Sequence, residues 1–510
     1  MNFSKLAVTL SLSCGLALPA LLTGCGVTTQ RSRLAAPLTA GESPVAISIT
    51  NNTREIHAFD EIKVKNLGTN ELHTLWRIKG IPSMDTSLYM DVLPAAEYQV
   101  VALVDSTTRR RVNLNEGASL FGNFRVKGGG PVDLGRLVIT PLNSKVLVGR
   151  SNKVSNNSTL IRGYTPYADQ FDKEAAGGWL DPRNPDDHVE EYAMSKPVEL
   201  SCFVEKDNAF VMASGRMGVL MLRHAKGNWS TLQSKNLAAL NCATPVDLPA
   251  YDLLVTGEFG TLLGHVKGSG ELRHISTGNL PFGDLWRIVG SEKHGWYIAI
   301  YNGDSMALFH SPVLENGNWT EVRREAADKF WMWPTANGLA YTTGTKTIEM
   351  LDFSSGKWSS YAVPEGKVFS FRISPTGMMA IEKWRSRYVS YDAGQHWEEV
   401  KIVLPAGASP SGGMQQMSDG SLVVMASVRP GFGSALYRSI DKGKTWELLN
   451  GFSSEYDVHA LKSIPLLQVE RAYRSPYMTV GSSFDGKNWR LEYTNFNLAE
   501  YERSKKSGSK

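Results

Sequence analysis

Two cysteines in the middle of the chain, Cys202 and Cys242, have a type and spacing that predict a defined covalent chemistry. They are separated by about 40 residues, and the other two of the four cysteines lie near the N-terminus. An even pair of cysteines in an oxidising compartment predicts a disulfide, and two buried free thiols are the alternative. A bridge requires Cα atoms about 4.4–6.8 Å apart. A loop of this length would contribute roughly 3–4 kcal/mol to stability.

The first 25 residues predict export from the cytoplasm. Lys5 precedes an apolar run over residues 6–22, and the run ends in Leu22-Thr23-Gly24-Cys25. This pattern is typical of a secretory signal. The final tetrapeptide resembles the bacterial lipobox, which implies that Cys25 becomes the N-terminal residue and carries acyl chains such as palmitate. Each buried CH₂ of such a chain contributes about 0.8 kcal/mol to membrane binding. A signal peptide with an incidental cysteine is the alternative.

The residue after Cys25 and the later sequence bear on location. Gly26 stands where an aspartate would imply retention at the inner membrane. The resemblance therefore implies an outer-membrane lipoprotein if the cell is Gram-negative. No later segment reaches about 18 uninterrupted apolar residues, so we expect the remainder of the chain to be soluble.

Three short segments share a Ser-x-Asp pattern with a following glycine and tryptophan. We expect the aspartate to accept backbone N–H groups across a hairpin and the glycine to adopt a positive φ. We expect the tryptophan to pack between neighbouring sheets. The residues are Ser390, Asp392, Gly394 and Trp397; Ser439, Asp441, Gly443 and Trp446; and Ser483, Asp485 and Trp489 in a variant shorter by one residue.

These segments resemble the Asp-box, or BNR, repeats of sialidases and of many other β-propellers. Sialidases use three arginines for the substrate carboxylate, a Tyr–Glu nucleophile pair and an aspartic acid. The first arginine lies in a Tyr/Phe-Arg-Ile-Pro motif, and the nearest candidates here are Arg372 in Phe371-Arg372-Ile373-Ser374-Pro375 and Arg287 in Trp286-Arg287-Ile288. The first candidate segment has an additional serine, and neither lies in the first repeat. Glu470 and Tyr473 are available, but no pair can be assigned.

The simpler interpretation is that Arg372 and Arg287 recur as first-strand residues of similar repeats, so no catalytic residue is assigned. The ten histidines are scattered without metal-ligand spacing, and no P-loop or Gly-x-Ser-x-Gly segment occurs. We therefore expect no metal and no cofactor. A formal net charge of +4 on 510 residues also gives no reason to expect a nucleic-acid partner.

A repeat begins near residue 196 and predicts the fold of the C-terminal part. Each unit ends in a turn followed by tryptophan, at Trp229, Trp319, Trp358, Trp397, Trp446 and Trp489. The interval of 90 residues between the first two covers two units, with residues 267–272 as a degenerate turn. Units of about 43 residues are typical of four-stranded blades arranged around an axis. We expect a β-propeller of about seven blades, with Cys202 and Cys242 on the first strands of the first two and the Ser-x-Asp hairpins far from the axis.

The chain as a whole is predicted to be all-β. Alternating apolar residues and turns over 45–145 predict an Ig-like or transthyretin-like β-sandwich. Residues 93–98, Leu-Pro-Ala-Ala-Glu-Tyr, resemble a turn and strand of transthyretin-like and carboxypeptidase-regulatory-like modules. The expected organisation is a signal peptide (1–24), a lipidated tether (25–44), the sandwich (45–145), a linker (146–195), the propeller (196–495) and a basic disordered tail (496–510).

Three functional hypotheses follow. The leading one is a non-catalytic module, anchored to the membrane through Cys25, whose propeller binds a partner protein or an envelope glycan. Asp-box propellers of this kind also resemble photosystem-assembly-type and sortilin-type propellers, which bind proteins. The alternatives are a sialidase-like exo-glycosidase and a structural component of a larger envelope machine.

Overall fold

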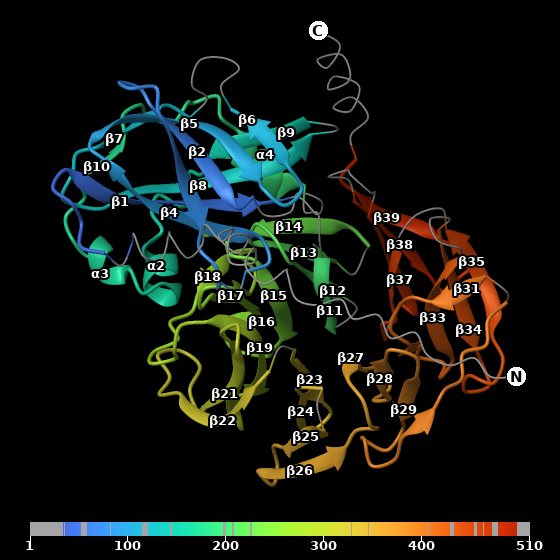
Figure 1. Cartoon of the computed structure of the whole chain (residues 1–510). Coiled ribbons are helices and arrows are strands. Elements are labelled where there is room, and N and C mark those ends of the chain that lie inside the picture. The colour runs from blue at the N-terminus through green and yellow to red at the C-terminus, as the bar shows by residue number, and fades with distance from the viewer. Residues whose placement is uncertain are drawn as a thin grey trace, which may run out of the picture.

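A computed structural model describes residue 34 and residues 36–496 (Figure 1), except 53–58, 82, 115–120, 143–144, 197–199, 207–208, 225–226, 328, 345, 406, 429–432, 453–455, 463 and 472–477. The described chain is all-β apart from three short helices. The N-terminal strands form one sheet, and the later strands form a series of small antiparallel sheets that make a β-propeller. We call the N-terminal sheet sheet A and the later sheets, in chain order, sheets B to H.

Sheet A is one continuous hydrogen-bonded sheet of ten strands. Its long strands β1 and β4 pair antiparallel, and β1 pairs parallel with β8 on its other side. The β-sandwich expected from the sequence has two separate sheets, whereas these strands belong to one. The strands are β1 (Glu42–Asn51), β2 (Glu61–Asn66), β3 (Leu72–Arg77), β4 (Thr86–Pro94), β5 (Ala96–Asp105), β6 (Arg110–Asn113), β7 (Asn123–Val126), β8 (Val132–Leu142), β9 (Lys145–Arg150) and β10 (Gly177–Trp179).

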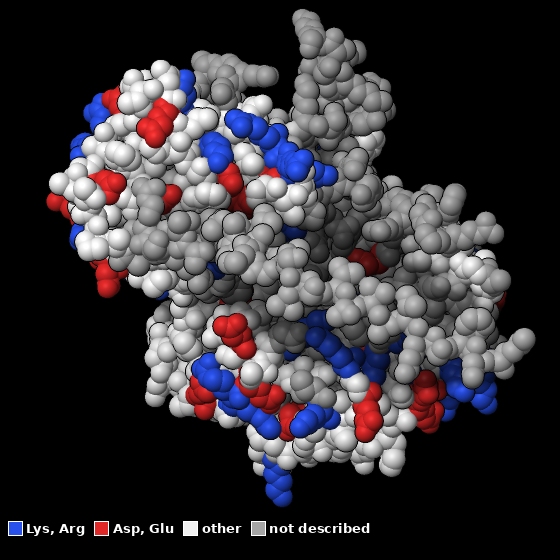
Figure 2. Space-filling view, viewed as in Figure 1, with Lys and Arg blue, Asp and Glu red and all other residues white. Residues whose placement is uncertain are grey.

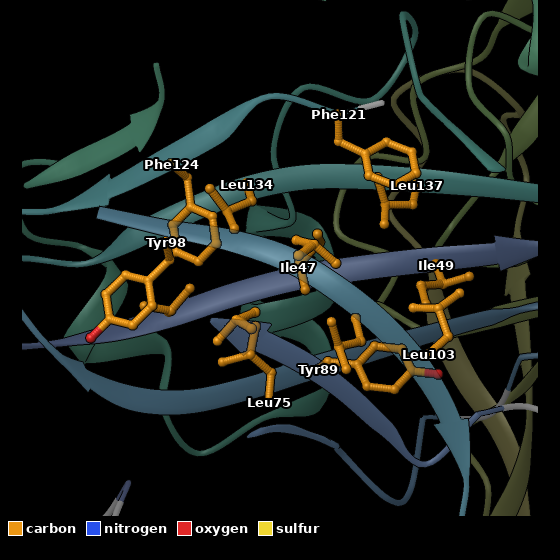
Figure 3. Packing of buried hydrophobic residues seen from close by; sticks show 14 of the residues in the cluster. Ile47, Ile49, Leu75, Tyr89, Tyr98, Leu103, Phe121, Phe124, Leu134 and Leu137 are labelled. Carbon is orange, nitrogen blue, oxygen red and sulfur yellow. The ribbon is translucent and has the colours of Figure 1, made fainter. Parts of the chain in front are cut away.

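The core of sheet A is enclosed by the sheet itself. Ile47 of β1, Leu75 of β3 and Leu137 of β8 are fully buried in one cluster, although β3 and β8 are not neighbours in the sheet (Figure 3). Tyr98 and Phe124 stack in the same cluster with ring centroids 5.4 Å apart. The curled sheet encloses this face, whereas the other face of β1 and β4 is buried in a second cluster with α2.

The stretch predicted to be a linker carries ordered elements. The helices are α2 (Ser158–Tyr164), α3 (Ala168–Phe171) and α4 (Val189–Ser195), and β10 returns to pair with β7 of sheet A. Ala193 and Met194 of α4 are buried in a cluster with residues of sheets B and H. This stretch therefore packs between sheet A and the propeller.

Sheets B to H are each built from strands consecutive in the chain. The innermost strand comes first, and antiparallel partners follow outward. Sheet B holds β11 (Leu200–Lys206), β12 (Ala209–Ser214), β13 (Val219–Arg223) and β14 (Trp229–Gln233); sheet C holds β15 (Leu240–Pro245), β16 (Tyr251–Gly257), β17 (Leu262–Val266) and β18 (Leu272–His274); sheet D holds β19 (Asp284–Ser291), β20 (Gly295–Tyr301), β21 (Ser305–Ser311) and β22 (Thr320–Ala326); sheet E holds β23 (Trp331–Thr335), β24 (Gly338–Thr342), β25 (Thr347–Asp352) and β26 (Lys357–Ala362).

The three remaining sheets follow the same plan with small variations. In sheet G the first-strand position is divided between two short strands that both pair with β33. Sheet F holds β27 (Val368–Ile373), β28 (Met379–Lys383), β29 (Arg387–Ser390) and β30 (Glu398–Glu399); sheet G holds β31 (Ala408–Pro410), β32 (Gln415–Gln416), β33 (Leu422–Val428), β34 (Ser434–Ser439) and β35 (Glu447–Phe452); sheet H holds β36 (Tyr456–His459), β37 (Leu466–Arg471), β38 (Met478–Ser483) and β39 (Arg490–Thr494).

The repeated tryptophans lie where the fourth strand begins. Trp229 opens β14, and Trp446 immediately precedes β35. Sheet C has Leu272 at the start of β18 in place of a tryptophan. Each tryptophan ring therefore packs at the outer part of a sheet. Because the ring recurs at the same place in successive sheets, the spacing between tryptophans equals the number of residues in one repeat.

The first and last sheets pack against each other. Met217 and Val219 of sheet B share a buried cluster with Leu467 and Val480 of sheet H. The side chains of Arg223 in β13 and Glu492 in β39 form an ion pair across the same contact, with 11% and 3% of their surfaces exposed. Contacts between side chains therefore join the two ends of the series. Among the described strands, no backbone pairing links sheet B to sheet H.

Sheet A and its helices cover one of the two faces of the propeller. Asp85 accepts a hydrogen bond from the backbone N–H of Met217, in the loop between the second and third strands of sheet B. Tyr164 of α2 donates one to Asp284, at the beginning of the first strand of sheet D. In an antiparallel sheet, the loop between the second and third strands lies on the same face as the beginning of the first strand. The opposite face, formed by the hairpins between first and second and between third and fourth strands, carries no such contact among the described residues.

Candidate functional site

A cavity of about 1660 Å³ lies where the first strands of the propeller sheets converge, and residues of every sheet from B to H line it. Pockets for small ligands are typically about 300–1,000 Å³, so this space is large enough for an oligosaccharide or a peptide segment. The lining includes the first hairpins of sheets E and F, at residues 334–337 and 374–377. The cavity therefore reaches the face opposite sheet A.

The cavity wall combines aromatic rings and side-chain hydroxyl or amide groups with aliphatic residues and a few charged ones. Trp286 is 40% exposed, and Trp331, Trp333 and Phe371 also line the cavity. Trp333 is held in place because its Nε1–H donates to the carbonyl oxygen of Phe371 at 3.1 Å. The remaining lining includes the polar side chains of Thr244, Thr335, Asn337, Ser359, Ser370, Ser374, Thr376 and Gln415.

Arg287 is one of the two arginines among the described residues of the cavity wall. It lies on β19, is 5% exposed, and donates from Nη1 to the carbonyl oxygen of Met332 at 3.1 Å. Its guanidinium carbon lies 4.8 Å from the centre of the Trp333 ring. Burial lowers the pKa of Arg287 to about 10. A buried guanidinium with one carbonyl partner is energetically unfavourable unless a further group compensates it.

Arg372 of β27 lines the same cavity. Burial lowers its pKa, and the charges of Asp457 and Glu382 oppose that effect. Glu382 is itself 2.6 Å from Arg387, so its charge is shared. The sequence interpretation placed Arg287 and Arg372 on the first strands of similar repeats. Both do lie on first strands, and in addition both face one cavity.

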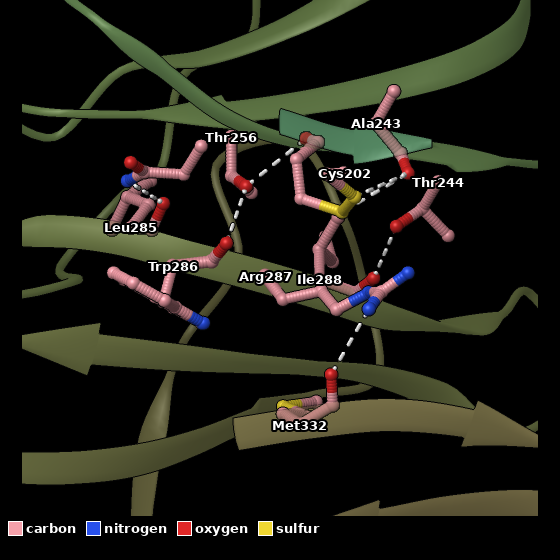
Figure 4. The surroundings of a disulfide bond; sticks show 11 residues. Cys202, Ala243, Thr244, Thr256, Leu285, Trp286, Arg287, Ile288 and Met332 are labelled. Atoms are coloured by element: carbon pink, nitrogen blue, oxygen red, sulfur yellow. Dashed lines mark hydrogen bonds between the residues drawn. A yellow bond between two sulfur atoms is a disulfide. The ribbon is translucent and has the colours of Figure 1, made fainter. Parts of the chain in front are cut away.

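Cys202 of β11 and Cys242 of β15 form a disulfide with Cα atoms 5.1 Å apart (Figure 4). The bridge joins the first strands of sheets B and C, and Cys202 lies in the cavity wall. Thr244 of β15 donates to the carbonyl oxygen of Ile288 in β19 at 2.7 Å. A disulfide and a hydrogen bond thus join three neighbouring first strands beside Arg287.

The Ser-x-Asp segments form the hairpins between third and fourth strands. In sheet G, Ser439 donates from Oγ to Asp441 Oδ1 at 2.7 Å and accepts the backbone N–H of Gly443 at 2.7 Å. The carboxylate also accepts the Thr445 backbone N–H at 2.9 Å and its hydroxyl at 2.7 Å. Gly443 has φ 89°, a conformation that favours glycine. These bonds hold the pKa of Asp441 down, at about 2.

The other two hairpins repeat this arrangement. Asp392 of sheet F accepts the His396 backbone N–H at 2.9 Å and the Ser390 hydroxyl, and Ser390 Oγ accepts the Gly394 backbone N–H. In sheet H, Asp485 accepts from Asn488, and Ser483 caps Gly486. Trp397, Trp446 and Trp489 each pack with buried residues of their own sheet and the preceding one. The hairpins are therefore structural, although Ala393 beside Gly394 also lines the cavity, so the hairpin of sheet F lies nearer the cavity than expected.

A second cluster of polar residues lies where sheet A meets the propeller, and no local sequence pattern indicates it. Glu258, in a loop of sheet C, is 1% exposed and accepts the Ser83 hydroxyl at 2.7 Å and the Met84 backbone N–H at 2.5 Å. Asp284 accepts the Tyr164 hydroxyl at 3.0 Å and the Phe259 backbone N–H at 3.3 Å. These carboxylates therefore bind sheet A and its helices to sheets C and D.

Burial raises the pKa of both carboxyl groups. The pKa of Glu258 is raised further by the charges of Asp85 and Asp284. The pKa of Asp284 rises to about 7, with its two hydrogen bonds partly opposing the effect of burial. Arg136, also buried, contributes an opposing positive charge near Glu258 and Asp85.

The raised pKa of Asp284 predicts that the contact between sheet A and the propeller weakens as pH rises. A carboxyl group whose pKa is higher in the folded than in the unfolded state stabilises the folded protein in its protonated form. This stabilisation is complete below the unfolded pKa and is lost as pH rises through about 7. Between pH 6 and pH 8 the protein should lose on the order of 1 kcal/mol of unfolding free energy from this residue. The Asp284→Asn variant should lack this component in urea unfolding measured across the same pH range.

Asp247→Asn is the matched control, because the Asp247 side chain is 94% exposed. Its pH profile should follow that of the natural protein. If Asp284→Asn also followed the natural profile, titration of Asp284 at the contact would be excluded.

Several sequence predictions lie outside the described residues. Cys25, its expected lipid and Tyr473 are among them, and nothing is described of the Glu470 side chain. None of the helices in the described part is both long and apolar enough to cross a bilayer. Within the same part, no group of three or more histidine, cysteine, aspartate or glutamate side chains is arranged to hold a metal ion.

Comparison with known proteins finds likeness only to solved structures, at low TM-scores. No protein-family model and no curated protein sequence matches the chain. Among solved structures, "YCF48 bound to D1 peptide" aligns at TM-score 0.36 and 15% identity over 50% of this chain and 81% of that one. Virginiamycin B lyase from Staphylococcus aureus aligns at 0.40 and 11% over 58% and 94%. The Myceliophteria thermophila Cps50 (Swd1) β-propeller domain aligns at 0.37 and 10% over 56% and 95%. The chain is a β-propeller protein, and likeness at these scores carries no argument about its ligand.

Proposed function

We propose that this protein is an envelope lipoprotein whose propeller is a non-catalytic binding module for a protein or glycan ligand. The observation that carries the proposal is the cavity of about 1660 Å³ with its exposed Trp286 and its polar lining. Aromatic faces and convergent hydroxyl and amide groups suit peptide or sugar recognition. The ligand enters from the face opposite sheet A.

The proposal includes a complete ring of seven blades, one for each of sheets B to H, with Asp-box hairpins in sheets F, G and H. Two observations support it. Every one of these sheets contributes to the same central cavity, and sheets B and H share a buried cluster and the Arg223–Glu492 ion pair. Closure buries the faces of sheets B and H that would otherwise be exposed at the two ends of the series.

Anchoring through Cys25 is the part of the proposal that rests on the sequence alone. Cells expressing the full chain should incorporate an alkyne-labelled palmitate into the protein, and the Cys25→Ala variant should not incorporate it. Label on the alanine variant, or none on the natural protein, would contradict the anchor.

The binding function is tested with the detergent-solubilised full-length protein on arrays of defined peptides and glycans. We expect saturable binding to a subset of one array, without chemical change in the ligand. Trp286→Ala should weaken binding at least about tenfold, since stacking on one ring is worth roughly 1–3 kcal/mol. Trp384→Ala is the control, because Trp384 is 76% exposed and is not part of the cavity wall. No binding on either array, or equal loss in both variants, would contradict the function.

A sialidase-like activity is the second candidate, and the presence of Arg287 and Arg372 in one cavity favours it. The described lining holds two arginines, whereas the sialidase pattern requires three. A fluorogenic sialoside assay distinguishes the candidates. Turnover that disappears in Arg372→Ala would establish the enzyme and overturn the non-catalytic proposal.

A further inference from the structure

Arg287 is unusual among the buried cations of the described chain because no carboxylate lies near it. Burial is the sole influence on its pKa, whereas the pKa of buried Arg136 is also affected by four acidic groups. A guanidinium has five N–H donors. Nη1 donates to the Met332 carbonyl, and Nε is buried without a partner. Figure 4 shows the side chain on β19 with its one hydrogen bond directed to Met332.

The unused donors of Arg287 lie on the edge of the guanidinium that binds carboxylates. Nε and Nη2 point in parallel, and together they match the two oxygens of a carboxylate. Neither atom has a hydrogen bond among the described residues, since the bond to Met332 comes from Nη1. This donor pair is unpaired on a side chain that forms part of the cavity wall, with Nε itself buried.

The surroundings of Arg287 limit the ligand further. Trp333 lies against the guanidinium, with 4.8 Å between the Arg287 carbon and the ring centre. Trp286 and Phe371 line the same cavity. A guanidinium with a carbonyl and a ring face as partners, and no carboxylate, balances one negative charge, and aromatic faces in the cavity wall favour a flat apolar body attached to that charge.

We propose that Arg287 anchors a carboxylate site in the central cavity, and that this site takes an organic monocarboxylate whose flat apolar part lies against aromatic rings of the cavity wall. This inference rests on the proposed binding function and specifies the chemistry of the ligand. The ligand supplies the negative charge that the buried guanidinium lacks. The buried cation is thus unfavourable in the free protein and is neutralised when the ligand binds.

The test uses the full-length protein in detergent and four probes: benzoate, its neutral isostere benzamide, acetate and inorganic phosphate. Binding is measured by isothermal calorimetry and by the shift in Tm. We expect benzoate to bind with a millimolar Kd, as suits so small a probe, and to raise Tm in proportion to its occupancy. Benzamide and acetate should each bind at least about tenfold more weakly, since each lacks one of the two recognised features.

Two variants separate a ligand-binding Arg287 from a structural one. Arg287→Met should lose benzoate binding by at least about tenfold while its Tm without ligand stays equal or rises, because a buried charge has been replaced by an apolar group of similar length. Arg385→Met is the matched control, since Arg385 is exposed and is not part of the cavity wall, and it should bind benzoate normally.

The outcomes distinguish failure of the site from failure of the function. Unchanged benzoate binding in Arg287→Met, or a lower Tm without ligand, would overturn the carboxylate site. Phosphate or benzamide binding as well as benzoate would also overturn it. In each case, array binding that depends on Trp286 would still support the proposed binding function. Absence of array binding would contradict that function itself.

Discussion

Replacement of Arg223 by methionine is expected to lower the free energy of unfolding by about 3 kcal/mol, because it leaves a carboxylate buried without its cation. Arg223 Nη2 lies 2.9 Å from Glu492 Oε1, and the Glu492 side chain is 3% exposed. This pair joins the first and last propeller sheets. Urea unfolding followed by tryptophan fluorescence measures the loss, since Trp229 begins β14 of sheet B and Trp489 immediately precedes β39 of sheet H.

Two further variants show whether the effect belongs to this contact. Arg324→Met removes the cation of a surface pair whose side chains are 46% and 38% exposed, and it should cost less than about 1 kcal/mol. The double variant Arg223→Met/Glu492→Leu should regain most of the loss, because no unpaired charge remains. Equal losses in Arg223→Met and Arg324→Met would mean that the pair does not hold the sheets together.

Loss of the Cys202–Cys242 disulfide is expected to have an effect of similar size. The bridge closes a sequence separation of 40 residues, and a cross-link of that span stabilises by roughly 3–4 kcal/mol through its restriction of the unfolded chain. The Cys202→Ala/Cys242→Ala variant should show this loss in urea unfolding. Addition of a reductant should reduce the stability of the natural protein by the same amount and leave the variant unchanged.

Thiol labelling of the unfolded, unreduced protein provides the independent check. We expect both cysteines to resist labelling until reductant is added. Labelling of both residues without reductant, together with unchanged stability of the double variant, would restore the alternative of two buried free thiols.

The propeller could be predicted from the sequence because its signal repeats. The tryptophans are spaced by one sheet each, and the structure places them where fourth strands begin, as Trp229 and Trp446 illustrate. The Ser-x-Asp hairpins were predictable for a related reason. All their hydrogen bonds, such as that from the Thr445 backbone N–H to Asp441, join residues within a few positions of one another.

The form of sheet A could not be predicted in the same way. Alternation of apolar side chains identifies strands and their buried faces, but it does not determine which strands pair. The parallel pairing of β1 with β8 joins residues nearly 90 positions apart, and β10 enters the sheet from the stretch expected to be a linker. Both pairings make one sheet from what the sequence divided into a sandwich and a connection.

The cavity and the sheet A contact illustrate the same limit for sites. Arg287 and Arg372 were noticed because they recur in similar segments, but their common cavity follows from the ring and not from either segment. Glu258 carries no local pattern, because its partners Ser83 and Met84 are about 175 positions away. Sites assembled from distant segments leave little trace in a single sequence.

The closure of the propeller by side chains alone has a consequence for its evolution. Since each sheet is a contiguous stretch of chain and no strand is shared between neighbours, duplication or deletion of one stretch would alter the circumference without breaking any backbone pairing elsewhere. The junction of sheets B and H would then adapt through a few substitutions, such as at Arg223 and Glu492. Gain or loss of whole sheets is thus compatible with separate divergence, in each sheet, of the hairpins on the face opposite sheet A.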